Sequence, residues 1–199
     1  MSELWQIYED SMKESKRKIK KIKRLERQRQ EQMKKDNIVL IGMPGVGKST
    51  VGVILAKILG YQFVDADLVI QKEEGKLLKD IIAEKGTDGF IQVENRVNSN
   101  LQVHESVVAT GGSVVYGTEA MEHLSEIGTV VYLKQSLRKL ERRLRNIKNR
   151  GVVLRPGQTL KDLYRERTVL YEKYADIVVD ESDLNVEQTV EAVIAALKR

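Results

Sequence analysis

The sequence predicts a three-layer, doubly wound α/β domain built on a parallel sheet of five strands, and three observations support this prediction. From residue 37 onward, short apolar runs rich in Val and Ile alternate with longer amphipathic runs. The short runs, such as residues 38–41, are apolar at every position, which is typical of strands covered on both faces. Helical runs separate the strands, as parallel pairing requires.

The individual elements follow from these two patterns, taken in chain order. Short runs of β-branched and aromatic residues predict strands at residues 38–41, 63–65, 107–109, 129–133 and 177–179. Helical periodicity predicts helices at residues 48–59, 77–84, 88–103, 119–124, 137–148, 160–174 and 186–197. With only two prolines and no internal repeat, residues 37–199 are predicted to form one domain.

Residues 1–36 are predicted to form a basic helical extension. They hold 12 of the 34 basic and 7 of the 29 acidic residues, so the remaining residues are balanced at 22 of each sign. Apolar residues recur at helical spacing, as at Tyr8, Met12, Ile19 and Ile22. Three interpretations remain open: a solvated helix, a docking or dimerising helix, and a contact with nucleic acid or another anionic surface. Because the domain carries no charge surplus, we expect no nucleic-acid partner. We also expect the protein to be a monomer or a weak dimer.

The chain contains no cysteine, which excludes disulfides, thiolate nucleophiles and cysteine-based metal sites. Its longest apolar runs are about five residues, whereas roughly 20 are needed to span a bilayer. The Lys-rich start also lacks the apolar stretch of a secretory signal. We therefore expect a cytoplasmic protein that does not bind membranes.

A phosphate-binding loop follows the first predicted strand. The segment from Gly42 to Ser49 matches G-x-x-x-x-G-K-[ST] and lies between a strand and an amphipathic helix, as its mechanism requires. Backbone N–H groups of such a loop surround the phosphates, Lys48 reaches the β- and γ-phosphates, and the Ser49 hydroxyl holds Mg²⁺. The predicted nucleotide-binding residues of the loop are Gly42, Gly45, Val46, Gly47, Lys48, Ser49 and Thr50.

Two carboxylates and a pair of glycines follow later strands, at the same predicted edge of the sheet. Asp65 and Asp67 end the second strand, where one could support Mg²⁺ and the other could accept a proton from an attacking hydroxyl. Gly111 and Gly112 follow the third strand, and a turn without side chains lets backbone amides approach a small ligand. Six arginines come next, one or two of which could close over a transferring phosphoryl group: Arg138, Arg142, Arg143, Arg145, Arg150 and Arg155.

Together these residues resemble the shikimate kinase family, small P-loop kinases with a fold like that of the nucleoside-monophosphate kinases. The resemblance spans residues 37–199. Its landmarks occur in the family's order: the loop at 42–50, Phe63-Val64-Asp65-Ala66-Asp67, Phe90 with Glu94, Ala109-Thr110-Gly111-Gly112, and Arg167 with Tyr171, Ala175 and Asp176.

The resemblance implies an ATP:shikimate 3-phosphotransferase of aromatic amino-acid synthesis that uses ATP and Mg²⁺. It implies that Asp67 contacts the acceptor hydroxyls and acts as or near the base, that Asp65 supports Mg²⁺, and that Arg167 binds the acceptor carboxylate. Gly111 and Gly112 would form the turn that faces the acceptor.

The resemblance also implies an arginine on the adenine side of the site and a second one on a lid, about seven residues later. Arg143 and Arg150 have this spacing, so we prefer Arg143 for the adenine side and Arg150 for the lid. Arg155, which precedes Pro156, remains the second candidate for the lid arginine.

The chain departs from the family at Ile91, where the pattern Phe-Arg-x-x-Glu has its arginine. An aliphatic group cannot replace a planar guanidinium that binds a carboxylate. Arg96 is poorly placed to compensate, because five residues correspond to about 140° around a helix. Ser113 also replaces the third glycine of the family's turn. These changes keep two alternatives open: a kinase of another hydroxylated metabolite, and a nucleotide-binding regulatory module with a decayed substrate site.

Overall fold

The computed structural model describes residues 12, 14, 16–21, 35–144, 155 and 157–198. The chain divides into two compact units, Met1–Lys34 and Lys35–Arg199, which are described separately. In the first unit, residues 16–21 are helical, and Lys18 pairs with Glu14 one helical turn away, at 2.8 Å. Tyr8 and Ile22 of the predicted apolar stripe lie outside the described residues.

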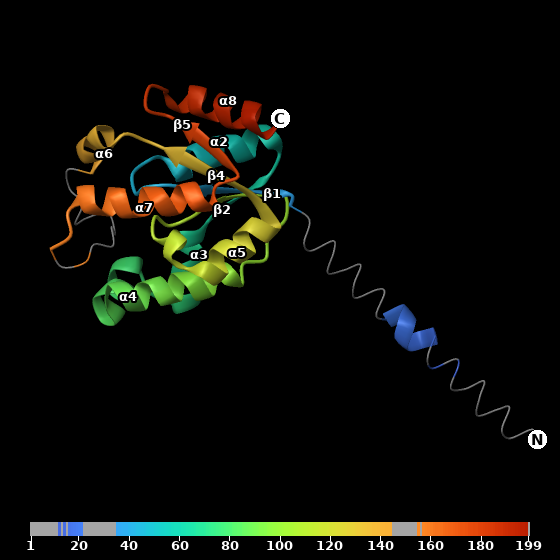
Figure 1. Ribbon diagram of the computed structural model, residues 1–199. Coiled ribbons are helices and arrows are strands. Elements are labelled where there is room, and N and C mark those ends of the chain that lie inside the picture. The colour runs from blue at the N-terminus through green and yellow to red at the C-terminus, as the bar shows by residue number, and fades with distance from the viewer. Residues whose placement is uncertain are drawn as a thin grey trace, which may run out of the picture. The chain divides into compact units, whose positions relative to one another are not determined.

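The second unit contains a sheet of five parallel strands, which confirms the predicted fold (Figure 1). The strands lie in the order β2-β3-β1-β4-β5. Their bounds are β1 (Asn37–Ile41), β2 (Gln62–Asp65), β3 (Ser106–Ala109), β4 (Gly128–Lys134) and β5 (Ile177–Asp180). All five were predicted within one or two residues, because their uniformly apolar runs are those of a sheet buried on both faces.

Helices cover both faces of this sheet (Figure 1). Helices α2 and α8 pack together on one face, whereas α5 and α7 pack on the other, with α3 and α4 beyond α5. Their bounds are α2 (Lys48–Leu59), α3 (Ala66–Glu74), α4 (Leu78–Ser99), η1 (a 3₁₀ turn, Val114–Tyr116), α5 (Thr118–Ile127), α6 (Leu137–Arg143), α7 (Leu160–Tyr174) and α8 (Val186–Leu197). Within the described ranges, no helix is long and apolar enough to cross a membrane.

The helix predictions were accurate for α2, α7 and α8, whereas one helix was missed and the ends of α4 and α5 were misplaced by three or four residues. Helices α7 and α8 begin at capping boxes, in which Thr159 and Asn185 accept hydrogen bonds from the first turn. Helix α3 was not predicted. The break predicted between the helices at 77–84 and 88–103 lies at Gly86, whose φ of 69° and ψ of −178° are not helical, so α4 consists of two helical pieces joined at a kink. The second piece ends at Ser99 rather than at residue 103. The predicted end of α6 at residue 148 lies outside the described residues, which follow α6 only to Leu144.

The core lies on both sides of the central strands and holds the sheet in position. Val39, Leu40 and Ile41 of β1 are completely buried, and a smaller apolar cluster around Ile81 and Phe90 joins α3 to α4. Because the strands are parallel, the loops after β1, β2 and β3 meet at one edge of the sheet. This edge carries the predicted site residues.

Candidate functional site

The loop between β1 and α2 has the backbone conformation of a phosphate cradle. Gly42, Gly45 and Gly47 have φ angles of 146°, 75° and 117°, a region that residues with a Cβ rarely adopt. The neighbours are also close, because a Cβ on Gly42 would lie 2.7 Å from the Leu133 carbonyl oxygen and one on Gly45 would lie 2.8 Å from the Leu144 side chain. Backbone angle therefore favours glycine at all three positions, and the close neighbours favour it again at Gly42 and Gly45.

Lys48 begins α2 and is buried beneath the loop. Its ammonium donates hydrogen bonds to the carbonyl oxygens of Gly42, at 2.7 Å, and Met43, at 3.2 Å. Burial lowers the pKa of Lys48 to about 8, and the nearby Asp67 carboxylate partly opposes this effect. The lysine is thus held at the centre of the loop, where phosphate oxygens would stabilise its charge.

Ser49 and Asp65 meet across the site although they come from different elements. The Ser49 hydroxyl donates a hydrogen bond of 3.1 Å to one Asp65 carboxylate oxygen, and the backbone N–H of Asp67 donates one of 3.0 Å to the other. Asp65 therefore also caps the N-terminus of α3. A hydroxyl and a carboxylate oxygen at this distance are ligands that suit Mg²⁺, so these two residues fit the predicted cation.

Asp67 lies in the first turn of α3 and lines the cavity of the site. Burial raises its pKa, the Asp65 carboxylate acts in the same direction, and Lys48 opposes both effects. A carboxylate with a raised pKa is a better proton acceptor than an exposed one.

The turn after β3 brings Asp67 together with groups from α4 and α7. A Cβ on Gly111 would overlap the Glu94 carboxylate and come within 2.9 Å of an Asp67 oxygen. A Cβ on Gly112 would come within 3.1 Å of an Arg167 guanidinium nitrogen. Both glycines are needed for these close approaches, so the structure brings together the residues that were predicted to bind the acceptor.

Arg167 is fixed in a buried position, with 1% of its surface exposed. Its Nε donates a hydrogen bond of 3.3 Å to the Tyr116 hydroxyl, and its guanidinium lies 5.1 Å from the centre of the Tyr116 ring. One turn later on α7, the Tyr171 hydroxyl donates a hydrogen bond of 2.6 Å to the Gly112 carbonyl. Helix α7 thereby anchors both the guanidinium and the glycine turn.

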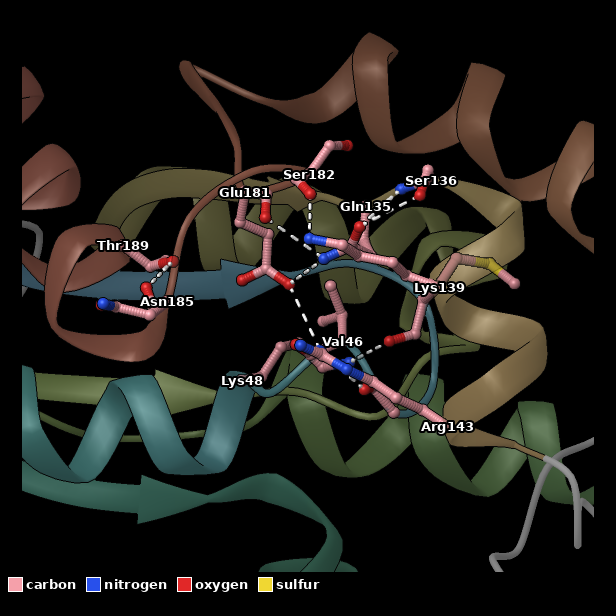
Figure 2. Close-up of polar contacts among 12 residues, drawn as sticks. Val46, Lys48, Gln135, Ser136, Lys139, Arg143, Glu181, Ser182, Asn185 and Thr189 are labelled. Atoms are coloured by element: carbon pink, nitrogen blue, oxygen red, sulfur yellow. Dashed lines mark hydrogen bonds and ion pairs between the residues drawn. The ribbon is translucent and has the colours of Figure 1, made fainter.

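At the other end of the site, Arg143 of α6 lies against the phosphate-binding loop (Figure 2). It donates hydrogen bonds to the carbonyl oxygens of Gly45 and Val46, at 3.3 and 2.7 Å, and lies 3.5 Å from a Glu181 carboxylate oxygen. Glu181 is buried, and the same oxygen accepts a hydrogen bond of 3.0 Å from the Gln135 amide. Burial raises the pKa of Glu181, and the hydrogen bond from Gln135 opposes this effect.

One cavity of about 580 Å³ joins these parts, a size typical of small-ligand sites. It extends from Asp67 and the glycine turn, along the phosphate-binding loop, to Arg143 and the start of α8. Its lining includes Gly45, Val46, Gly47, Lys48, Ser49, Thr50, Asp67, Gly111, Gly112, Arg143, Glu181 and Asn185.

The lid arginine is described only in part. Arg150, the preferred candidate, lies outside the described residues. Arg155 is exposed, with its guanidinium 5.9 Å from the centre of the Tyr116 ring and 3.6 Å from a Glu166 oxygen. Tyr116 therefore contacts Arg155 as well as Arg167. Sequence reasoning missed Tyr116, for which there was no signal, and Glu181, which its position directly after β5 could have indicated.

Arg96 does not take the place of the arginine that the family pattern has at position 91 of α4. Ile91 is half-buried. Arg96 points to α3, where it pairs with Glu73 at 3.2 Å and Glu74 at 2.6 Å. This agrees with the expectation that Arg96 does not compensate.

Comparisons with known proteins agree with this geometry. The sequence profile of the shikimate kinase family matches residues 44–198. Shikimate kinase of Persephonella marina is 36% identical over 163 residues, which cover 81% of this chain and 99% of the relative. That of Thermodesulfovibrio yellowstonii is 37% identical over 166 residues, covering 82% and 95%.

Solved structures give the same result. Shikimate kinase from Acinetobacter baumannii, solved in complex with shikimate, superposes with a TM-score of 0.72 and 30% identity, covering 81% of this chain and 92% of that one. The enzyme from Aquifex aeolicus superposes with a TM-score of 0.69 and 32% identity, covering 81% and 96%. The matching family profile and relatives of this identity and coverage show that this chain belongs to the shikimate kinase family.

Proposed function

We propose that the protein transfers the γ-phosphoryl group of ATP to the 3-hydroxyl of shikimate. The observation that carries this proposal is the convergence of Asp67, the turn at Gly111 and Gly112, and Arg167 beside the phosphate-binding loop. A carboxylate for a hydroxyl group and a buried guanidinium for a carboxylate match the two functional groups of a hydroxylated carboxylic acid.

In this reaction the 3-hydroxyl oxygen bonds to the γ-phosphorus, the bond from that phosphorus to the β,γ-bridging oxygen breaks, and ADP keeps the electron pair. Asp67 is placed to accept the hydroxyl proton, and its raised pKa favours that transfer. Lys48 and the N–H groups of the loop stabilise the charge on the phosphates. Arg167 orients the acceptor by its carboxylate, and Arg150 or Arg155 supplies a further positive charge from the lid.

The proposal includes Mg²⁺, held by Ser49 and Asp65 together with phosphate oxygens. The support is the 3.1 Å contact between their oxygens at the edge of the cavity. A bound Mg²⁺ would neutralise charge on the phosphates and order them for in-line transfer. Arg143 is proposed to line the adenine side. A cytoplasmic location, where ATP is available, and a monomer or weak dimer remain predictions.

One observation favours a second candidate, a kinase of a different hydroxy acid. Ile91 presents an aliphatic side chain where the family pattern has the second arginine of the acceptor site, and Arg96 is occupied on the outer face of α4. An acceptor with an apolar group toward α4 would suit this residue better.

The test is ADP release with shikimate, compared with other hydroxy acids and sugar acids, in an assay coupled to NADH oxidation. The product is identified by ³¹P NMR. We expect turnover with shikimate that requires Mg²⁺ and is lost in Asp67→Asn, with ATP binding retained. Absence of turnover at millimolar shikimate, with turnover of another acid, would replace the first candidate by the second.

A further inference from the structure

Glu94 on α4 is a buried carboxyl group with no role in the mechanism above. Its side chain is 1% exposed. Within the described residues neither carboxylate oxygen has a hydrogen-bond partner. The Ser113 hydroxyl lies close enough to favour the charged form, although its geometry is not that of a hydrogen bond. An unsatisfied buried carboxylate is costly, so this position calls for a physical explanation.

Charged groups from three other helices surround Glu94. Asp67 of α3 approaches it across Gly111, and Lys48 of α2 and Arg167 of α7 both interact with it electrostatically. The neutral phenol of Tyr171, also on α7, faces it as well. Glu94 therefore lies behind the acceptor turn, within the field of the guanidinium that is proposed to bind the acceptor.

The neighbours on α5 do not contribute a charge to this cluster. Glu119 accepts a hydrogen bond of 2.6 Å from the Asn95 side chain, next to Glu94 but on the exposed side of α4. The His123 ring contacts the Leu101 carbonyl oxygen at 2.7 Å, beyond the end of α4.

The residue at position 91 decides which cation Glu94 can use. Positions 91 and 94 are three residues apart on α4, so their side chains lie on the same face, one turn apart. An arginine at 91 could pair with Glu94, whereas Ile91 cannot. In this chain the cations that act on Glu94 are Arg167 and, more weakly, Lys48, so Glu94 shares with the acceptor carboxylate the guanidinium of Arg167.

We propose that Glu94 sets the affinity for the acceptor, because its carboxylate, when charged, competes with the acceptor carboxylate for Arg167. Glu94 is thus a positioning residue that acts through Arg167, and this role assumes the acceptor of the proposed function. Neutral Glu94 leaves the charge of Arg167 to the acceptor, whereas charged Glu94 neutralises part of it.

The charge of Glu94 is poised to change near neutral pH. Burial raises the pKa of Glu94 to about 7, and Asp67 acts in the same direction, against the effects of Ser113, Arg167 and Lys48. Glu94 is therefore mostly neutral below pH 7 and mostly charged above it. Bound acceptor favours the neutral form and raises this pKa further, so acceptor binding above pH 7 must be accompanied by proton uptake.

The experiment measures the uptake of a proton when shikimate binds. Shikimate binding is followed by isothermal titration calorimetry at pH 7.5, in buffers of different ionisation enthalpy, and the dissociation constant is measured from pH 6 to 8.5. For the wild type we expect uptake of part of a proton. We also expect affinity to weaken above pH 7, by about tenfold for each unit by which shikimate raises the pKa of Glu94.

Two variants test the assignment, and one serves as a control. Glu94→Gln keeps the shape but cannot titrate, so it should bind shikimate with less proton uptake than the wild type and with a weaker dependence on pH; Lys48, with a pKa of about 8, accounts for what remains. Ile91→Arg keeps Glu94 but gives it a partner that holds it charged in both states, so uptake should also decrease. Glu119→Gln, an exposed change next to α4, should behave like the wild type.

Each outcome decides a different point. Shikimate binding by the wild type without proton uptake, or uptake as large in Glu94→Gln as in the wild type, would overturn the role of Glu94 and leave the proposed function intact. No shikimate binding or turnover at pH 6, where Glu94 is neutral, would overturn the proposed acceptor as well.

Discussion

Replacing Ile91 by arginine is the most direct test of acceptor recognition in this protein. The new guanidinium would lie on α4, one helical turn from Glu94, and hydrogen bonds to charged groups contribute roughly 1.5–3 kcal/mol each. One such bond to the acceptor carboxylate should therefore tighten shikimate binding by about ten- to a hundredfold.

The same substitution should not unfold the protein. Loss of the half-buried Ile91 side chain costs about 1 kcal/mol of stability, which is half of the hydrophobic free energy of a fully buried aliphatic side chain. Pairing with Glu94 acts in the opposite direction. If the pKa of Glu94 returned from about 7 to the ordinary 4.5, the free energy of unfolding at pH 8 would rise by up to about 3 kcal/mol. We therefore expect similar or slightly higher stability.

The assay is the dissociation constant of shikimate by calorimetry at pH 7.5, together with KM and the affinity for ATP. Ile91→Met controls for a long neutral side chain and should leave affinity unchanged. Ile91→Lys places a charge without a planar pair of donors and should give a smaller gain. If folded Ile91→Arg protein binds ATP normally but binds shikimate no better than the wild type, the acceptor carboxylate does not lie near α4 and the native acceptor is a different acid.

Three further predictions concern single residues of the site. Lys48→Ala should lower kcat by roughly 10²–10³-fold in the coupled assay, because charge stabilisation of the phosphates is lost; retained activity would refute the P-loop assignment. Gly111→Ala should lower stability to urea by about 1–3 kcal/mol and raise the KM for shikimate, because its Cβ would overlap Glu94. Glu94→Gln should gain stability relative to the wild type as pH rises from about 4.5 to 7, by up to about 3 kcal/mol.

The sign of the last prediction follows from proton binding. Folded wild type keeps a proton on Glu94 that the unfolded chain releases above about pH 4.5, so wild-type stability falls until the folded pKa near 7 is passed. The glutamine variant has no such loss. A difference between the two proteins that is constant from pH 5 to 8.5 would show that Glu94 titrates normally. Urea unfolding of both proteins at about pH 4.5 and about pH 7 measures this difference in stability, with Glu119→Gln as the control.

The fold was predictable because its strands are buried on both faces and therefore uniformly apolar. Helix α3 was missed because it is short and begins inside the Asp65-x-Asp67 motif, whose first residue also serves as its cap. The break predicted between residues 84 and 88 was correct, because the backbone of Gly86 leaves the helical region there, with a positive φ. A glycine adopts such a conformation at little cost, so it is a useful sign of an interruption in a helical pattern.

The site was predictable to the extent that parallel strands bring their ends together. The meeting of Ser49 with Asp65, and of Asp67 with Gly111, follows from the order of β1, β2 and β3. The environment of Glu94 could not be predicted, because it depends on three helices that pack around one carboxyl group. The sequence motif marks this residue but gives no measure of its burial or of its missing partner.

The contact between Gly45 and Leu144 affects how mutations in the phosphate-binding loop should be interpreted. Leu144 directly follows α6 and precedes the segment with the preferred lid arginine, and it touches Gly45 where a Cβ would need space. A side chain at position 45 would therefore push against the Leu144 side chain as well as narrow the phosphate cradle. In a survey of inactive variants, a defect at Gly45 would combine a packing effect at the end of α6 with an effect on the loop, whereas a Cβ at Gly47 would meet no protein atom within 4 Å and would bring no such packing effect.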